Sequence, residues 1–138
     1  MDLAEIARRQ RAAREFTHDV GGASGARFTL RTLTAHERRC ELMRLIELPS
    51  SDGPARELTG EQIERLTRRI VERSIVGWES VTIAHLLPDE VATDVVPWSE
   101  QAVPLLLDAQ PDWERELRSA IAEHGTARAA AEESDAKN

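Results

Sequence analysis

The chain has 138 residues and is poor in several residue types: it contains one cysteine, no tyrosine, two phenylalanines and a single lysine, Lys137. The one cysteine, Cys40, excludes an internal disulfide framework. No run approaches the roughly 18 consecutive apolar residues of a membrane-spanning helix, and the first residues lack the apolar stretch of a signal peptide. We therefore expect a protein that neither crosses a membrane nor is secreted, and that works in the cytoplasm of the cell that makes it.

Acidic residues outnumber basic ones by 25 to 18, and the excess is concentrated in one segment. Residues 88–116, here called the acidic module, contain eight acids and one base and so carry the whole net charge of −7. Such a surface repels nucleic acid and favours solubility or a basic partner. The bases are nearly all arginine, which we attribute to a GC-rich coding sequence.

A chain of this length is expected to form one domain with a real core. Its apolar patterns predict a mainly α-helical (α+β) fold, a small helical domain with one N-terminal β-hairpin and a disordered C-terminal tail. The expected parts are an N-terminal helix (1–15), a single globular domain (16–125) and a disordered tail (126–138). The N-terminal helix has a narrow apolar face, made by Leu3, Ile6 and Ala7. We therefore expect this helix to be frayed or to become stable only when a partner binds it.

The first half of the globular domain contains clear local signals. Two alternating apolar runs around a glycine-rich connection predict the hairpin over 16–32. Helices are predicted over about 34–48 and 59–76, and each begins with a capping box. The two boxes are formed by Thr34 with Glu37 and by Thr59 with Gln62.

The second half begins with a segment, 78–98, that we predict to be irregular with at most a short extended piece, and Gly77 is expected to end the helix before it. Short helices are predicted over about 99–109 and 111–124. The first contains the run from Val103 to Leu107, which is apolar on all sides and is therefore expected to be buried. Gly125 closes the second, and the small polar residues after it predict disorder.

Candidate catalytic and metal-binding groups are few. The glycines at 21, 22 and 25 lack the lysine and hydroxyl residue that a phosphate-binding loop needs. His36 and Cys40 form half of a metal site, and no second pair with ligand spacing follows. Neighbouring acids such as Asp89 and Glu90 have nothing beside them that would raise one pKa selectively. We therefore predict no enzyme activity, no metal and no cofactor.

The basic run in the N-terminal helix, from Arg8 to Arg14, is the one candidate for a nucleic-acid contact. Acidic neighbours dilute it and the whole chain is acidic, so we interpret it as a solvated helix face. The weakest functional hypothesis, a small regulatory or nucleic-acid-binding protein, would use this helix and would show salt-sensitive retention on DNA.

Three tryptophans, Trp78, Trp98 and Trp113, dominate the aromatic content. Most such residues anchor a core, but tryptophan is also enriched where proteins bind one another. Trp98 is the best candidate for a docking residue, because it lies in the acidic module just before a predicted helix. The acidic module would then hold an apolar, basic segment of another protein.

Three segments of the chain resemble one known family. They are RFTLRTLTAHERRCEL (27–42), SIVGWESV (74–81) and VVPWSEQAVPLLLDAQPDWERELRSAI (95–121), the last with a proline–aromatic–Ser–Glu step before a leucine-rich helix. They resemble the small tail assembly chaperones of long-tailed bacteriophages. The resemblance implies a non-enzymatic helical protein of the bacterial cytoplasm that coats the tape measure protein, recruits tail tube protein and leaves before the tail is complete.

The resemblance and the acidic module together suggest five partner-binding residues, although each is equally a core candidate. They are Trp98, Leu105, Leu106, Trp113 and Leu117. The alternative is a structural component of the virion, such as a head–tail connector or minor tail protein. A chaperone would be absent from purified particles, whereas a structural component would be present there in fixed copy number. Neither hypothesis involves nucleic acid or a membrane.

Overall fold

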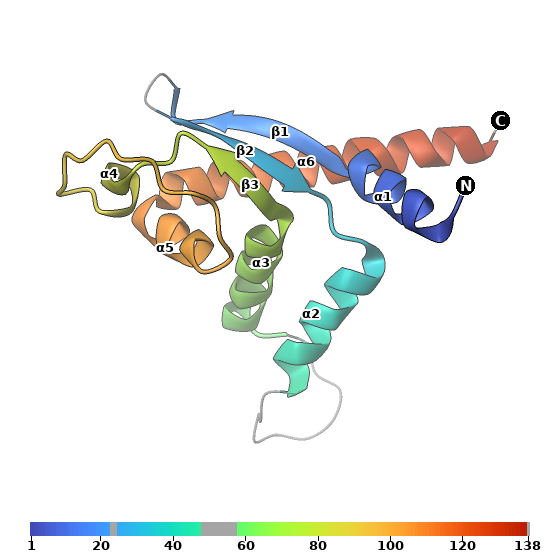
Figure 1. Ribbon diagram of the computed structural model, residues 1–138. Coiled ribbons are helices and arrows are strands. Elements are labelled where there is room, and N and C mark those ends of the chain that lie inside the picture. Colours follow the sequence, from blue (N-terminus) through green and yellow to red (C-terminus); the bar gives the residue numbers. More distant parts are fainter. Residues whose placement is uncertain (23–24, 48–57, 138) are drawn as a thin grey trace.

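The computed structural model describes residues 1–22, 25–47 and 58–137, and for residues 47 and 128–137 it describes the backbone alone. The described part contains six helices and three strands (Figure 1). In chain order they are α1 (Leu3–Ala13), β1 (Glu15–Val20), β2 (Ala26–Arg31), α2 (Ala35–Glu47), α3 (Gly60–Ser74), β3 (Ile75–Glu79), α4 (Ile83–Leu86), α5 (Ala102–Ala109) and α6 (Pro111–Lys137). The predicted α+β class with an N-terminal hairpin is confirmed.

The sheet is antiparallel with the strand order β1-β2-β3. In the hairpin, Phe16 pairs with Leu30 and His18 pairs with Phe28. Alternate residues of β2 are buried, so one face of the sheet faces the core and the other faces solvent. At the hairpin tip Gly21 has a φ of +74°, and a Cβ there would lie 3.0 Å from a ring carbon of Trp113. Glycine is therefore needed at this position for both its backbone angle and its size.

Strand β3 corrects the prediction of a helix as far as residue 76. Helix α3 ends at Ser74, and Ile75 starts the strand, with Gly77 inside it rather than at a helix end. Gly77 pairs with Thr29, and Trp78 pairs with Phe28 on the core face. The β-branched pair at 75 and 76 favours a strand, and pairing with β2 buries both Ile75 and Trp78.

Both predicted capping boxes are present. The backbone N–H of Glu37 donates to Thr34 Oγ1 over 3.0 Å, and the Glu37 carboxylate accepts from the Thr34 N–H over the same distance. Thr59 and Gln62 make the same reciprocal pair, at 3.1 and 2.9 Å. Each box satisfies N–H groups that have no partner inside the helix, which fixes where α2 and α3 begin.

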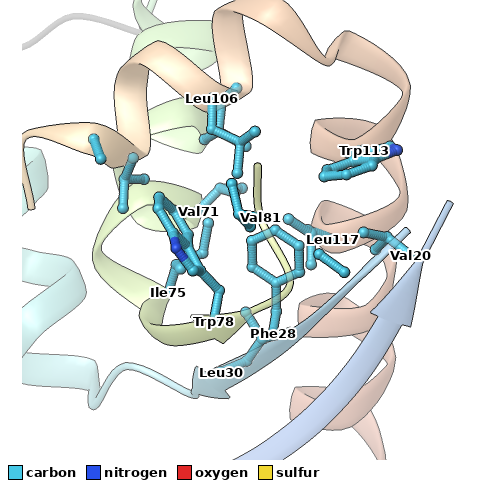
Figure 2. Packing of buried hydrophobic residues seen from close by; sticks show 14 residues of the cluster. Val20, Phe28, Leu30, Val71, Ile75, Trp78, Val81, Leu106, Trp113 and Leu117 are labelled. Carbon is cyan, nitrogen blue, oxygen red and sulfur yellow. The ribbon is translucent and has the colours of Figure 1, made fainter. Parts of the chain in front are cut away.

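The core lies between the inner face of the sheet and helices α3, α5 and α6 (Figure 2). Phe28 lies at its centre, fully buried, with Trp78 on one side and Trp113 on the other. Both pairs have edge-to-face geometry, with ring centroids 5.9 and 6.1 Å apart and interplanar angles of 76° and 84°. Two of the three tryptophans are therefore core anchors.

The last helix is longer than predicted. Instead of ending at Gly125, α6 continues to Lys137, into the segment where the sequence predicted a disordered tail; residue 138 lies outside the described residues. Gly125 lies inside the helix with open space where a Cβ would be. The alanine-rich stretch after it has high helix propensity, which favours continuation of the helix past the glycine.

Helix α1 has no buried residue, and Leu3 is 83% exposed. Its attachment is polar: the Arg14 guanidinium at its end donates to Glu37 over 3.0 Å, and the Arg14 carbonyl accepts from the Thr32 N–H. This agrees with the thin apolar face seen in the sequence. None of the described helices combines the length and apolar character that crossing a bilayer would require.

Arg68 of α3 joins that helix to α5 and α6. Its guanidinium donates to Asp108 over 2.8 Å, to Glu114 over 3.3 Å and to the Pro104 carbonyl over 3.1 Å, and it also pairs with Glu72 over 3.2 Å. Burial lowers the pKa of Arg68, but the hydrogen bond to Asp108 and the charge of Glu114 outweigh it, so the net shift is upward. We call this set the Arg68 clamp.

A second polar cluster joins α2 to α3. The carboxylate of Glu41 is 3% exposed and accepts from Arg73 over 3.0 Å and from Arg69 over 3.3 Å, with Arg44 at 3.5 Å. Among the side chains of α2 that the structure describes, Glu41 and Leu45 are the buried ones. Helix α2 is therefore attached mainly through charge.

Candidate functional site

The five predicted partner-binding residues lie in different environments. Leu106 and Leu117 are fully buried and Trp113 is 8% exposed, so all three belong to the core. Leu105 is 60% exposed, because α5 packs on one side only and turns this leucine outward. Trp98 lies between these extremes.

Trp98 is partly buried and packs against the core cluster. Its ring lines a cavity of about 310 Å³, which Arg69 and Arg73 border on the polar side. The indole Nε1 is covered and has no hydrogen-bond partner within the described part of the chain. A buried indole N–H normally finds an acceptor. Trp98 therefore packs against the core while its indole N–H lacks an acceptor among the described residues.

Three strongly exposed apolar side chains lie in residues 87–95, here called the acidic loop, which overlaps the start of the acidic module. Leu87 is 56% exposed, Val91 is 92% exposed and Val95 is 65% exposed. The same nine residues include three acids, Asp89, Glu90 and Asp94, and no base. Large apolar side chains are normally scattered singly on a surface, so three in one short acidic loop are notable.

Backbone hydrogen bonds hold both ends of the acidic loop. At its start, the N–H of Leu87 donates to the Ile83 carbonyl over 2.8 Å and that of Glu90 to the Leu87 carbonyl over 2.9 Å. The N–H of Ile83 donates to the Asp94 carbonyl over 3.0 Å and that of Ala84 to the Ala92 carbonyl over 3.2 Å. The Val96 N–H donates to Val81, and the Val96 carbonyl accepts from the Trp78 indole over 2.8 Å. These bonds tie the loop to β3 and α4, so its apolar side chains are presented to solvent from an ordered backbone.

Helix α4, which precedes the acidic loop, is joined to the end of α5. The side-chain amide of Gln110 donates to the His85 carbonyl over 3.0 Å, which links the end of α5 to α4. Figure 1 shows α4, α5 and the connecting loops grouped at one end of the molecule, away from α1. The candidate site is this end, with Leu105 and the three apolar residues of the acidic loop as its exposed side chains.

Sequence reasoning named Trp98 and four residues of the predicted helices, but it missed the exposed side chains of the acidic loop because it treated 78–98 as irregular. Periodicity gives no signal for these residues, because Leu87, Val91 and Val95 are four residues apart, as on one face of a helix. The usable signal is local composition, because Pro88 and three acids lie among them.

The titratable groups form ion pairs rather than a reactive cluster. In the described residues no three His, Cys, Asp or Glu side chains gather as metal ligands. His36 Nε2 lies 3.6 Å from Cys40 Sγ on the surface of α2. The pKa of Asp19 is lowered chiefly by its hydrogen bond from Arg27, an exposed pair on the hairpin. These contacts supply no arrangement of nucleophile, base and orienting group.

Comparison of the chain with protein-family models, with curated proteins and with solved structures finds no match in any of the three.

Proposed function

We propose that this chain is a tail assembly chaperone of a long-tailed bacteriophage or prophage, a non-enzymatic protein that binds the tape measure protein and tail tube subunits in the cytoplasm of the bacterial host. The observation that carries the proposal is the acidic loop, in which a hydrogen-bonded backbone holds exposed apolar side chains among acidic ones. The sequence resemblance in the segments 27–42, 74–81 and 95–121 supports the same assignment.

The physical requirements of such a role match this surface. A chaperone for a long, aggregation-prone partner must cover apolar segments while staying soluble, and it must release them when the tail tube polymerises. A few exposed side chains such as Leu87, Val91 and Leu105 offer modest apolar contact area. The surrounding acids attract a basic partner and raise its association rate, and salt weakens binding because it screens this attraction.

The first experiment is co-expression with the tape measure and tail tube proteins encoded beside this chain, followed by a pull-down and a solubility assay of the tape measure protein. We expect co-purification and a soluble tape measure protein. If the tape measure protein aggregates and this chain purifies alone, the chaperone proposal is wrong. Finding the chain in purified virions at fixed copy number would instead identify a structural component.

Variants of the exposed residues test the site itself. Replacing Leu87, Val91 and Leu105 together with serine should reduce recovery of the tape measure protein at least about tenfold, an effect expected of removed apolar anchors. Leu3→Ser is the matched control, because Leu3 is also exposed but lies on α1. Equal recovery with both variants would exclude the acidic loop as the docking surface.

A further inference from the structure

The two edges of the sheet differ in how far they are covered. Along β3, the Trp78 indole donates to the Val96 carbonyl over 2.8 Å, and Thr82 just beyond the strand forms an isolated antiparallel bridge with Val95. Strand β1 is the other edge, and no described strand pairs with its outer side. Figure 1 shows β1 along the outer margin of the sheet. An uncovered edge presents backbone donors and acceptors that another strand can use.

The hairpin register identifies which residues face outward. The Thr32 N–H donates to the Arg14 carbonyl over 3.0 Å, so this pair is hydrogen-bonded across the start of the hairpin. Hydrogen-bonded and non-hydrogen-bonded pairs alternate in an antiparallel ladder, so the backbone groups of residues 16, 18 and 20 point toward β2. Those of Glu15, Thr17 and Asp19 point away from it, toward the open edge.

The side chains beside this edge are acidic. Glu15, Thr17 and Asp19 are exposed on the outer face of the strand, and Asp19 is 68% exposed even with Arg27 beside it. On the inner face, Glu116 of α6 lies 3.2 Å from His18 and is 46% exposed. Carboxylates therefore flank the open backbone groups on both faces of the strand.

The same carboxylates disfavour pairing with a second copy of the chain. If two β1 strands met antiparallel at this edge, Glu15 of one copy would lie near Asp19 of the other, and directly opposed like charges are unfavourable. A strand with basic residues on its outer face meets no such repulsion. The charge pattern of the edge therefore selects against self-association and in favour of a basic strand.

We propose that the outer edge of β1 binds an extended segment of a partner protein in which basic residues alternate with small apolar ones. The segment adds a fourth strand, and its backbone pairs with Glu15, Thr17 and Asp19. Its basic side chains lie beside Glu15 and Asp19, and its apolar ones lie against Phe16, which is half-buried and stacks on His124 of α6 with ring centroids 4.0 Å apart. This surface is separate from the acidic loop and does not rest on the proposed function.

The test uses the full chain labelled with ¹⁵N and the synthetic peptide acetyl-Val-Arg-Val-Thr-Val-Arg-Val-amide. The amides of Glu15, Thr17 and Asp19 are expected to exchange with solvent at least about tenfold more slowly when the peptide is bound, because they gain carbonyl partners. The amides of residues 16, 18 and 20 are already bonded within the hairpin and should change little. Protection at the acidic loop without protection at 15, 17 and 19 would overturn the proposal.

Two controls separate strand addition from general charge attraction. A peptide with glutamate in place of both arginines should bind at least about tenfold more weakly. Thr17→Pro removes an outward N–H without removing a bond to β2 and should weaken binding by a similar factor, whereas Thr17→Val should not. Equal binding of both peptides refutes the charge argument, and equal binding by Thr17→Pro and wild type refutes strand addition. Concentration-dependent protection of 15, 17 and 19 without peptide would instead identify a second copy as the occupant.

Discussion

Replacing Arg68 with methionine is expected to destabilise the protein by about 2–3 kcal/mol. The substitution keeps much of the side-chain volume but removes the guanidinium, which is 25% exposed and contacts three elements. Breaking a fully buried ion pair costs about 3–5 kcal/mol. The cost is lower here because Glu114 keeps Arg118 at 2.8 Å and Glu72 keeps Arg69 at 3.5 Å, so neither carboxylate is left without a cation.

The individual contacts set the size of this estimate. The shortest one, to Asp108, contributes little because Asp108 is 72% exposed and the pair is screened by water. The contacts to Glu72 and Glu114 count for more, since those side chains are 16% and 15% exposed. Charged hydrogen bonds of this kind contribute about 1.5–3 kcal/mol each when they stand alone.

Urea denaturation and thermal unfolding measure the effect. At about 4 °C per kcal/mol for a domain of this size, Tm should fall by about 8–12 °C. Arg65→Met is the matched control on the same helix, because the Arg65–Glu61 pair is 58% and 75% exposed and should contribute less than about 0.5 kcal/mol. If the two variants lose the same stability, the Arg68 clamp does not hold α3 against α5 and α6.

Three further predictions concern other parts of the fold. Burial raises the pKa of Glu37, but the hydrogen bonds from the Thr34 N–H and Arg14 outweigh it, so the net shift is downward. The ionised carboxylate therefore stabilises the fold at neutral pH, and this stabilisation is lost as pH falls below the ordinary value of 4.5. Glu37→Gln should destabilise the protein at neutral pH, and the difference in stability between variant and wild type should shrink in acid denaturation curves. Gly125→Ala should raise the free energy of unfolding by about 0.5–1 kcal/mol, because the helix continues through this position, whereas a loss would show that the helix ends at Gly125. Phe28→Ala should cost about 3–5 kcal/mol in urea denaturation, because both neighbouring tryptophans lose their partner.

Local signals in the sequence were sufficient for the first half of the fold. A capping box needs only two residues three apart, and both boxes, at Thr34 and Thr59, are present. The hairpin likewise depends on residues close in the chain. Strand β3 was missed because its partner β2 lies far away in the sequence, and Ile75 continues the apolar stripe of α3 without a visible break.

The candidate site was harder to predict, because apolar character alone does not distinguish a core residue from a docking residue. Leu105 and Leu106 are adjacent and chemically identical, yet one is 60% exposed and the other fully buried. Only the direction in which α5 packs decides between them, and this depends on residues distant in the chain such as Leu117. The sequence analysis attributed the abundance of arginine to a GC-rich coding sequence and so underestimated its structural role. Arg68 joins α3 to α5, and Arg69 and Arg73 join α3 to α2.

The charged attachment of α2 has a consequence for how the molecule opens. Among the described side chains of α2, only Leu45 and Glu41 are fully buried, so separating α2 from α3 would uncover few fully buried side chains of α2. An element that uncovers so little apolar area has a low free energy of local opening and can detach while the sheet and α6 remain folded. In native-state hydrogen exchange, α2 should therefore behave as a separate cooperative unit whose amides exchange long before those of β2.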